Sequence, residues 1–261
     1  MSIQRLIKAI TLIAILFICS SCVSHIDKGS FGIMDRSLNN KSHGYQIVDD
    51  HTGSAPTAKI ERFEVQPGDC SHGEGGGWSD CANDRERSEL KEPVDRRMTR
   101  SGSEYWYTWS IYFPEDFVNV YPTKLCVGQF HQHKGHVIWM TQVRDDGLIW
   151  DHQVLGRTTV VWPLIDEADL RGKWHTINLY VKWSKHDDGP DMGVLKLWVN
   201  DELKVDYIGQ TCKSKLVYFK YGVYRSFMSR YKNANDVDDV PGQVVYYANV
   251  KRAKSESDLE P

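Results

Sequence analysis

The stretch Glu104-Tyr-Trp-Tyr-Thr-Trp-Ser-Ile-Tyr-Phe113 is long, aromatic and alternating, and Pro114 ends it. Side chains alternate between the two faces of a β-strand, so this pattern predicts a strand with one face in a core. Comparable patterns follow one another at short spacing along the chain. They cover residues 60–65, 85–91, 125–131, 136–143, 148–154, 175–183, 193–203, 215–224 and 243–252. We therefore expect one all-β domain over residues 59–253.

Turn signals separate these strands, and no segment has the pattern of an amphipathic helix of twelve or more residues. Asn200-Asp201 suits the turn of a hairpin within 193–203, and 166–172 is expected as a short helix. Many strands joined by short turns predict a concanavalin-like β-jelly-roll sandwich of two antiparallel sheets. One sheet is expected to curve into a concave groove that fits a sugar chain.

Composition excludes two broad classes of protein. The 261 residues carry 32 Lys+Arg against 35 Asp+Glu, a net charge of −3, and no basic run occurs. This balance argues against a dedicated nucleic-acid binder. Hydrophobic residues make up 41% and charged residues 26%, which is typical of a globular protein and not of a disordered one.

Residues 1–22 are typical of an export signal. Arg5 and Lys8 precede an apolar run that ends at Cys19 and is shorter than the roughly 20 residues that span a bilayer. Small residues before Cys22 resemble a bacterial lipoprotein signal, in which Cys22 becomes the acylated N-terminus. We expect an outer-membrane or cell-surface lipoprotein, or a periplasmic or secreted protein, whose only membrane contact is that lipid. Residues 23–58 are expected as a polar tether and lead-in, and 254–261 as a C-terminal tail.

Four cysteines lie outside the signal, and export permits disulfides. Cys70 and Cys81 flank a Gly-rich loop that a bridge between them would hold in place, so we expect this disulfide. Cys126 and Cys212 are expected either as a second bridge or as buried thiols. A zinc site is disfavoured because these four cysteines include no Cys-x-x-Cys spacing.

Three polar segments interrupt the apolar pattern. In the first, 85–91, alternation places four side chains on one face of a strand: Arg85, Arg87, Glu89 and Lys91. Three cations and one carboxylate suit an anion-binding surface, and a solvated outer face is the alternative.

The second segment is Gln129-Phe-His-Gln-His133, in which Gln129, His131 and His133 share a face. An amide donates to carboxylate oxygens, and a neutral imidazole accepts a proton near neutral pH. A chance polar stripe and a His-x-His metal pair are the alternatives, although no third metal ligand is obvious.

The third segment is Tyr218-Phe-Lys-Tyr-Gly-Val-Tyr-Arg-Ser226, in which Tyr218, Lys220, Gly222 and Tyr224 share a face. Gly222 is expected to leave room above the sheet for a substrate ring. The alternative is an aromatic strand with a lysine at its edge.

Together, the three segments resemble the signature strands of the alginate-lyase-like, jelly-roll polysaccharide lyases. Those strands carry Arg-Ser/Thr-Glu-Leu/Val, Gln-x-His and Tyr-Phe-Lys-x-Gly-x-Tyr, in the order found here. Residues 68–90 also resemble heparin lyase I and glucuronan lyase, and the whole resemblance covers roughly residues 59–251. Lys91 stands where the alginate enzymes usually carry a second Arg, so lyase chemistry is implied more firmly than an alginate substrate.

The resemblance implies cleavage of an acidic, uronic-acid-containing polysaccharide (glucuronan-, heparin- or alginate-like) by β-elimination, which leaves 4,5-unsaturated ends. Arg87 and Gln129 would neutralise the substrate carboxylate. Tyr224 would be the acid, and either His131 or Tyr224 the base; Lys220 and Arg87 would lower the pKa of the Tyr224 phenol. The expected substrate-binding residues are Lys220, Lys91, Glu89, Arg85, His133, Tyr218 and Arg225. No cofactor or catalytic metal is expected, and the acidic run 236–239 is either a structural calcium site or a solvated loop.

Three other functions are compatible with a sandwich. A non-catalytic carbohydrate-binding module of an exported lipoprotein would keep groove aromatics without needing Gln-x-His beside Arg and Tyr. A glycoside hydrolase needs two carboxylates at the scissile bond, and no Glu-x-Asp-x-x-Glu pattern occurs. A purely structural surface lipoprotein is the third alternative.

Overall fold

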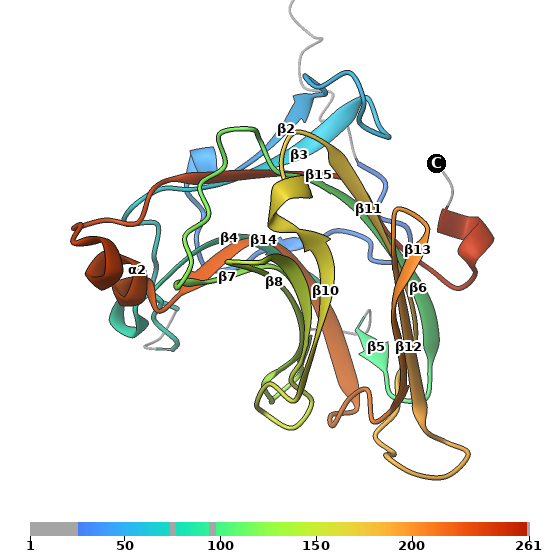
Figure 1. The fold of residues 1–261 in the computed structure, drawn as a ribbon. Coiled ribbons are helices and arrows are strands. Elements are labelled where there is room, and N and C mark those ends of the chain that lie inside the picture. The colour runs from blue at the N-terminus through green and yellow to red at the C-terminus, as the bar shows by residue number, and fades with distance from the viewer. Residues whose placement is uncertain (1–25, 74–76, 94–97, 260–261) are drawn as a thin grey trace, which may run out of the picture.

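The computed structural model describes residues 26–73, 77–93 and 98–259 and contains two antiparallel sheets packed face to face (Figure 1). The order in the eight-stranded sheet is β1 (Asp35–Arg36), β4 (Arg85–Lys91), β14 (Leu216–Ser226), β7 (Lys124–Gln132), β8 (Val137–Arg144), β9 (Gly147–His152) and β10 (Val160–Asp166), with β5 (Thr99–Arg100) beside β14. The order in the seven-stranded sheet is β13 (Glu202–Gly209), β12 (Gly193–Val199), β11 (Trp174–Lys182), β6 (Glu104–Tyr112), β15 (Gln243–Ala253), β3 (Lys59–Val65) and β2 (Tyr45–Asp49). The predicted all-β jelly-roll sandwich is confirmed.

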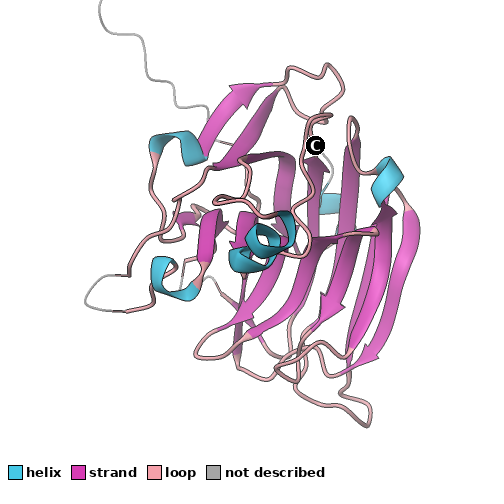
Figure 2. Ribbon diagram, turned by 60° about the vertical axis from the view of Figure 1, so that its left-hand side comes forward, coloured by secondary structure: helices cyan, strands magenta, loops and turns pink. Residues whose placement is uncertain are grey.

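Helices are short and lie around the strands (Figure 2). The α-helix α2 (Met228–Asn235) begins just after β14 ends. The 3-10 turns are η1 (Ser42–Gly44), η3 (Cys81–Asn83), η4 (Glu167–Asp169) and η5 (Glu256–Leu259). Within the described ranges, no helix has the length and apolar character that crossing a bilayer requires.

Aromatic rings from both sheets fill the space between them. The Phe130 ring centroid lies 5.0 Å from that of Tyr107, 4.9 Å from that of Phe219 and 5.2 Å from that of Trp183. Such tilted contacts are the arrangement that aromatic pairs prefer. Because Phe130 and Phe219 face this core, alternation turns their neighbours on β7 and β14 toward the opposite face of the sheet.

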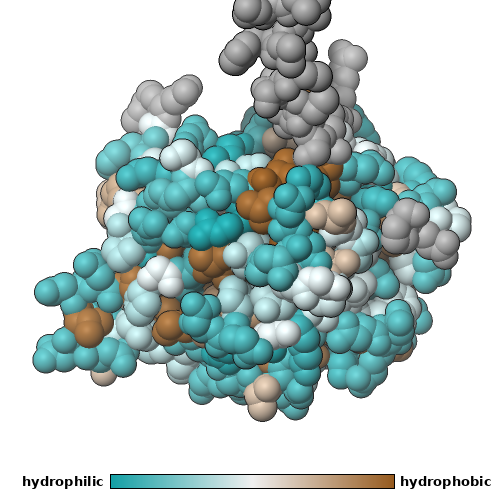
Figure 3. Space-filling model, turned by 90° about the horizontal axis from the view of Figure 1, so that it is seen from above, coloured by the Kyte–Doolittle hydropathy of each residue, from teal (hydrophilic) through white to brown (hydrophobic). Residues whose placement is uncertain are grey.

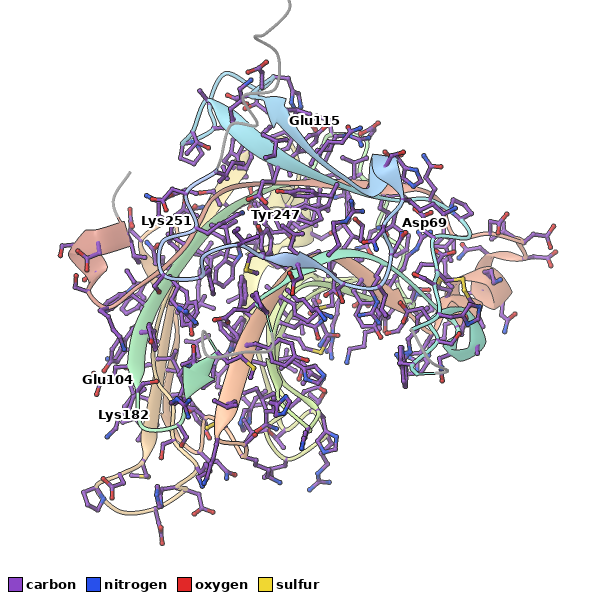
Figure 4. The ribbon with its side chains drawn as sticks, turned by 180° about the vertical axis from the view of Figure 1, so that it is seen from behind. Asp69, Glu104, Glu115, Lys182, Tyr247 and Lys251 are labelled. Atoms are coloured by element: carbon purple, nitrogen blue, oxygen red, sulfur yellow. A yellow bond between two sulfur atoms is a disulfide. The ribbon has the colours of Figure 1, made fainter. Side chains whose placement is uncertain are left out.

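A buried tyrosine also links the two sheets. Tyr247 of β15 lies in the interior (Figure 4) and is completely buried. Its hydroxyl contacts the backbone carbonyl oxygens of Val127 and Gly222, the latter at 3.0 Å, in strands β7 and β14 of the other sheet. A buried hydroxyl needs such partners, so Tyr247 sets the spacing of the sheets at this point.

The structure confirms two local predictions and limits a third. Asn200 and Asp201 have φ angles of 48° and 67°, as the two central residues of a type I′ hairpin turn require. Cys70 and Cys81 form the expected disulfide, with 5.0 Å between their Cα atoms. Cys126 and Cys212 are buried free thiols, so they form no second bridge.

The predicted domain boundaries are wrong at both ends. Residues 26–58 do not form a tether, because they supply β1, β2 and the fully buried Phe31, whose ring stacks on Phe219 at 5.7 Å. Near the other end, η5 lies within the predicted tail and buries Leu259. The strands β1 and β2 are too short to show a clear alternating pattern in the sequence. The predicted signal peptide and Cys22 lie outside the described residues.

The surface away from the core is mixed in character. Seen from above, apolar residues form separate brown patches among hydrophilic residues (Figure 3). β10 is the last strand of its sheet and contains Pro163, which a strand tolerates at such an edge.

A glycine is required at position 222 by the close packing of the strands and not by space for a substrate. Its φ is 125°, and an added Cβ would overlap the carbonyl oxygen of Ser88 and lie 2.7 Å from Cδ1 of Phe63. The crowded side therefore faces β4 and the core, and the expectation that Gly222 leaves room for a sugar ring is wrong.

We predict that Gly222→Ala lowers the free energy of unfolding by about 2–4 kcal/mol, because the methyl group adds both steric overlap and backbone strain. Urea denaturation measures this change. Gly242→Ala is the matched control: its Cβ would lie 3.6 Å from its nearest neighbour, and its effect should stay within about 0.5 kcal/mol. Equal midpoints for the two variants would contradict the crowding at Gly222.

Candidate functional site

A groove of about 700 Å³ lies on the face of the eight-stranded sheet that points away from the core. The strands β4, β14 and β7 run side by side beneath it, where the sheet curls (Figure 1). Their registers pair Arg87 with Tyr224, and Lys220 with Gln129. Arg87, Gln129, His131 and Tyr224 all line this groove, so the structure brings the four expected catalytic side chains to one place.

The groove is strongly cationic. Five basic side chains line it: Arg85, Arg87, Lys91, Lys124 and Lys220. Among the described residues, no acidic side chain lines it. This charge suits a polyanionic ligand. It also disfavours the glycoside hydrolase hypothesis, because hydrolysis requires two carboxylates facing the scissile bond.

One carboxylate beneath the groove connects all three strands. The Glu89 side chain on β4 is 2% exposed. Its Oε1 accepts a hydrogen bond from Nε2 of Gln129 at 2.6 Å, and its Oε2 accepts from Nζ of Lys220 at 2.6 Å and from Nη1 of Arg87 at 3.1 Å. Glu89 was expected to bind substrate, and this expectation is wrong because both oxygens are engaged by protein donors below the groove.

A second carboxylate, that of Asp80, orients Arg87. Nε and Nη2 of Arg87 donate to the two Asp80 oxygens at 2.5 and 2.6 Å, in the bidentate geometry that makes such pairs strong. The indole of Trp78 donates to Asp80 at 2.9 Å. With further bonds from Nη1 to Glu89 at 3.1 Å and to the hydroxyl of Ser37 at 3.5 Å, Arg87 uses four of its five N–H groups, which leaves one for a ligand.

His131 is held in the form of a base. Its Nδ1 lies 2.9 Å from the carbonyl oxygen of Gln132. A carbonyl only accepts, so Nδ1 carries the proton and Nε2 keeps a free lone pair. Burial lowers the pKa of His131 below its usual 6.5, and the nearby charges of Lys220 and Arg87 lower it further. The imidazole is therefore neutral at neutral pH, and it stacks on Tyr218 at 5.2 Å.

Tyr224 is held in the form of an acid. Its phenol oxygen accepts a hydrogen bond from Nη1 of Arg85 at 2.9 Å, and the guanidinium of Arg87 lies 4.2 Å from the centre of its ring. Burial raises the pKa of Tyr224 to about 12, although Arg87 and Arg85 act in the opposite direction. Burial therefore outweighs the cations that were expected to bring this phenol toward the range of a base.

Of the seven expected substrate-binding residues, four line the groove: Lys220, Lys91, Arg85 and Tyr218. Arg225 does not, because it follows Tyr224 on the strand and points to the opposite face. There it is fully buried, and its Nε donates to Glu86 at 2.6 Å. His133 also lies outside the groove lining, because β7 ends at Gln132 and the alternation stops there.

The expected His-x-His pair is therefore split, since only His131 faces the groove. Across residues 26–73, 77–93 and 98–259, no group of three or more His, Cys, Asp or Glu side chains is arranged to hold a metal ion.

The residues at or under the groove that sequence reasoning missed include Trp78, Asp80, Lys124, His136 and Phe227. Lys124 was hidden by a β-bulge. Counting back from Gln129 in steps of two leads to Leu125, but the register shifts between Cys126 and Gly128, which turns Lys124 to the groove side. The position of Asp80 beside Cys81 of the disulfide was the available signal for the second carboxylate.

Comparisons with known proteins agree with this geometry. The model of a family described as polysaccharide lyase matches residues 27–251. An endo-β-1,4-glucuronan lyase from the fungus Trichoderma reesei has the same fold, with a TM-score of 0.61 and 16% identity over 91% of this chain and 98% of that one. No curated protein sequence matches the chain.

Two alginate lyases also share the fold. A family 7 enzyme, A1-II′, solved in complex with product, gives a TM-score of 0.53 at 12% identity, over 83% of this chain and 85% of that one. An alginate lyase from Pseudomonas aeruginosa gives 0.50 at 16% identity, over 82% and 87% of the two chains.

We predict that Glu89→Gln lowers the free energy of unfolding by about 3–5 kcal/mol, because it leaves buried cations without their counter-charge. Urea denaturation at neutral pH measures the loss. The control is Glu202→Gln, which removes a surface partner of Lys204 and should change stability by less than about 1 kcal/mol. A Glu89→Gln protein as stable as the wild type would show that this carboxylate does not hold the three strands together.

Proposed function

The chain belongs to the polysaccharide lyase family, and we propose that it cleaves a uronic-acid-containing polysaccharide by β-elimination, leaving 4,5-unsaturated ends. The observation that carries this proposal is that His131, Tyr224, Arg87 and Gln129 line one groove together with four further basic side chains. Glucuronan-like, heparin-like and alginate-like chains all carry the carboxylates that such a groove attracts. Family membership argues against the alternative of a non-catalytic binding module.

The first requirement of this reaction is to neutralise the substrate carboxylate. The C5 proton of a uronate is weakly acidic, and an ionised carboxylate resists the further negative charge that its removal creates. The remaining N–H group of Arg87 and the second amide hydrogen of Gln129 are the donors for this task. Because Glu89 and Asp80 already fix both side chains, the donors need no reorganisation during the reaction, which is the main source of electrostatic catalysis.

The second requirement is to move two protons. Nε2 of His131 takes the C5 proton, and the electrons of that C–H bond form the C4–C5 double bond. The bond between C4 and the glycosidic oxygen breaks, and the leaving oxygen receives the proton of Tyr224. The resulting phenolate is stabilised by the hydrogen bond from Arg85 and by the adjacent Arg87. Every step in this scheme is carried by side chains of the chain itself.

Substrate binding is assigned to the remaining cations and to Tyr218. Lys220 sits between Glu89 and Tyr224, with its Nζ 5.8 Å from the centre of the tyrosine ring. Lys91 and Lys124 extend the positive charge along the groove. A chain of uronates would meet these cations in succession.

We also propose that the protein works outside the cytoplasm, as the N-terminal sequence predicts, with Cys22 as the lipid attachment site. The Cys70–Cys81 disulfide supports this location, because disulfides persist in oxidising compartments.

Tyr224→Phe should reduce lyase activity by at least roughly 10²–10⁴-fold, and His131→Ala by a similar factor, because each removes a group that transfers a proton. The assay follows the near-ultraviolet absorbance of unsaturated products released from glucuronans, alginates and glycosaminoglycans. Tyr180→Phe is the matched control, since Tyr180 and its acceptor Glu104 both lie in the seven-stranded sheet, which does not carry the groove. If the wild type released no unsaturated product from any polymer in this panel but bound one of them, the proposed reaction would be wrong.

The pH profile should separate the two roles. The active form of His131 is neutral, and burial lowers its pKa. We therefore expect kcat/KM to stay constant through neutral pH and to fall only on the acid side, below pH 6.5. Tyr224, with a pKa of about 12, should cause no loss between pH 7 and 10. A decline of activity near pH 9 that Tyr224→Phe removes would show that the phenol ionises far more readily than its burial implies.

A further inference from the structure

Besides Tyr218, the aromatic side chains of Trp78 and Phe227 line the groove without a part in the proton transfers. Trp78 is 50% exposed and Phe227 is 37% exposed, and both line the same groove as the proposed catalytic residues. Large exposed aromatic side chains inside a groove are costly to solvate and commonly mark a contact with a ligand. We call Trp78 and Phe227 the aromatic pair.

The aromatic pair lies next to the acid. The guanidinium carbon of Arg85 is 5.2 Å from the ring centre of Trp78 and 5.2 Å from that of Phe227, so Arg85 bridges the two rings. The guanidinium carbon of Arg230 lies 4.3 Å from the ring centre of Phe227, so Trp78 offers the larger free ring surface. The same guanidinium donates to the phenol oxygen of Tyr224 at 2.9 Å. The two rings and the proposed acid are therefore grouped around one guanidinium.

The strand registers also show on which side of Tyr224 the aromatic pair lies. On β14, Tyr218 lies opposite His131, Tyr224 lies opposite Arg87, and Ser226 lies opposite Arg85. His131 is thus toward one end of this strand and Phe227 follows the other end. The aromatic pair is beyond Tyr224 as seen from the base.

Phe227 is held in this position against its own backbone preference. Its φ is 60°, in the left-handed region that bulky residues rarely occupy. Its N–H donates to the carbonyl oxygen of Asp84 at 3.0 Å, and the Asp84 carboxylate accepts from the hydroxyl of Ser229 at 2.6 Å. Asp84 is left-handed as well, with a φ of 59°. Strained residues fixed by their surroundings occur mostly at functional sites, and burial in the core does not explain this one.

We propose that the aromatic pair is a stacking subsite for a pyranose ring on the leaving-group side of the scissile bond. This inference rests on the proposed function, in which Tyr224 protonates the oxygen that departs with that sugar. A pyranose has an apolar C–H face that packs on an aromatic face, while its hydroxyl groups stay hydrated at the rim. The subsite therefore recognises the shape of a sugar ring and adds to the charge recognition made by the lysines and arginines.

The test uses Trp78→Ala, Phe227→Gly and the double variant, assayed on the polymer that the wild type cleaves best. Each single variant should raise KM by about 5–10-fold and the double variant by about 30-fold or more, in line with the tenfold change that 1.4 kcal/mol represents. In Phe227→Gly the value of kcat should stay within about threefold, because no proposed proton-transfer group is changed. Trp78→Ala and Trp78→Phe both remove the indole N–H that donates to Asp80, so a change in kcat that they share belongs to that hydrogen bond, and the difference in KM between them belongs to the ring. Trp78→Phe should recover most of the affinity.

Phe227→Gly distinguishes binding from folding. Glycine adopts a φ of 60° without strain, so this variant should unfold at the same or a higher temperature than the wild type while it binds more weakly. Trp198→Ala is the control for loss of an aromatic ring, since Trp198 stacks on Trp106 in the other sheet; its KM should be unchanged. Wild-type KM values in folded Trp78→Ala and Phe227→Gly would overturn the subsite and leave the proposed lyase reaction standing.

If the wild type cleaves no polymer, calorimetric titration with β-1,4-glucuronan and alginate oligosaccharides still tests the subsite. Weaker binding by the double variant than by Trp198→Ala would support stacking on the aromatic pair. Equal binding by these two variants would overturn it.

Discussion

A buried negative charge that needs partners determines the arrangement of the groove. The carboxylate of Glu89 is almost completely buried, so it must be matched by donors within the protein. Those donors come from three neighbouring strands: Arg87 beside it on β4, Lys220 on β14 and Gln129 on β7. Their positions follow from this requirement, and so does the direction in which their unused N–H groups point. Asp80 extends the same principle to the far side of Arg87.

One physical factor gives the two proposed proton-transfer groups opposite tendencies. Burial disfavours the charged form of any group, so it keeps His131 neutral and Tyr224 protonated. The histidine is then a base and the phenol an acid at the same pH, and burial alone accounts for both. Hydrogen bonding completes the assignment, because Gln132 occupies Nδ1 of His131 and Arg85 approaches the oxygen of Tyr224.

Alternation along strands was enough to predict the sandwich and the convergence of four polar side chains, because β-strands impose a period of two. The same rule failed wherever a strand was irregular or ended. A bulge hid Lys124, and the end of β7 removed His133. Arg225 obeys the rule: it follows Tyr224 in the strand, so alternation places it on the opposite face, where it is buried, and the prediction that it binds substrate was wrong. Asp80 lies in a loop, and Phe227 has a left-handed backbone conformation just after its strand ends. The period of two applies to neither position.

Tyr247 shows that the layer carrying the site is not self-sufficient. Its hydroxyl reaches the carbonyls of Val127 and Gly222, and both lie where the register of the catalytic strands shifts. The curvature of one layer is thus fixed by a side chain of the layer behind it. If the three polar strands were transplanted into a different sandwich, the carbonyl oxygens of Val127 and Gly222 would lose their hydrogen-bond donor. The irregular parts of β7 and β14 could then relax. Protein engineers who wish to move this site would have to carry the supporting strand β15 along with it.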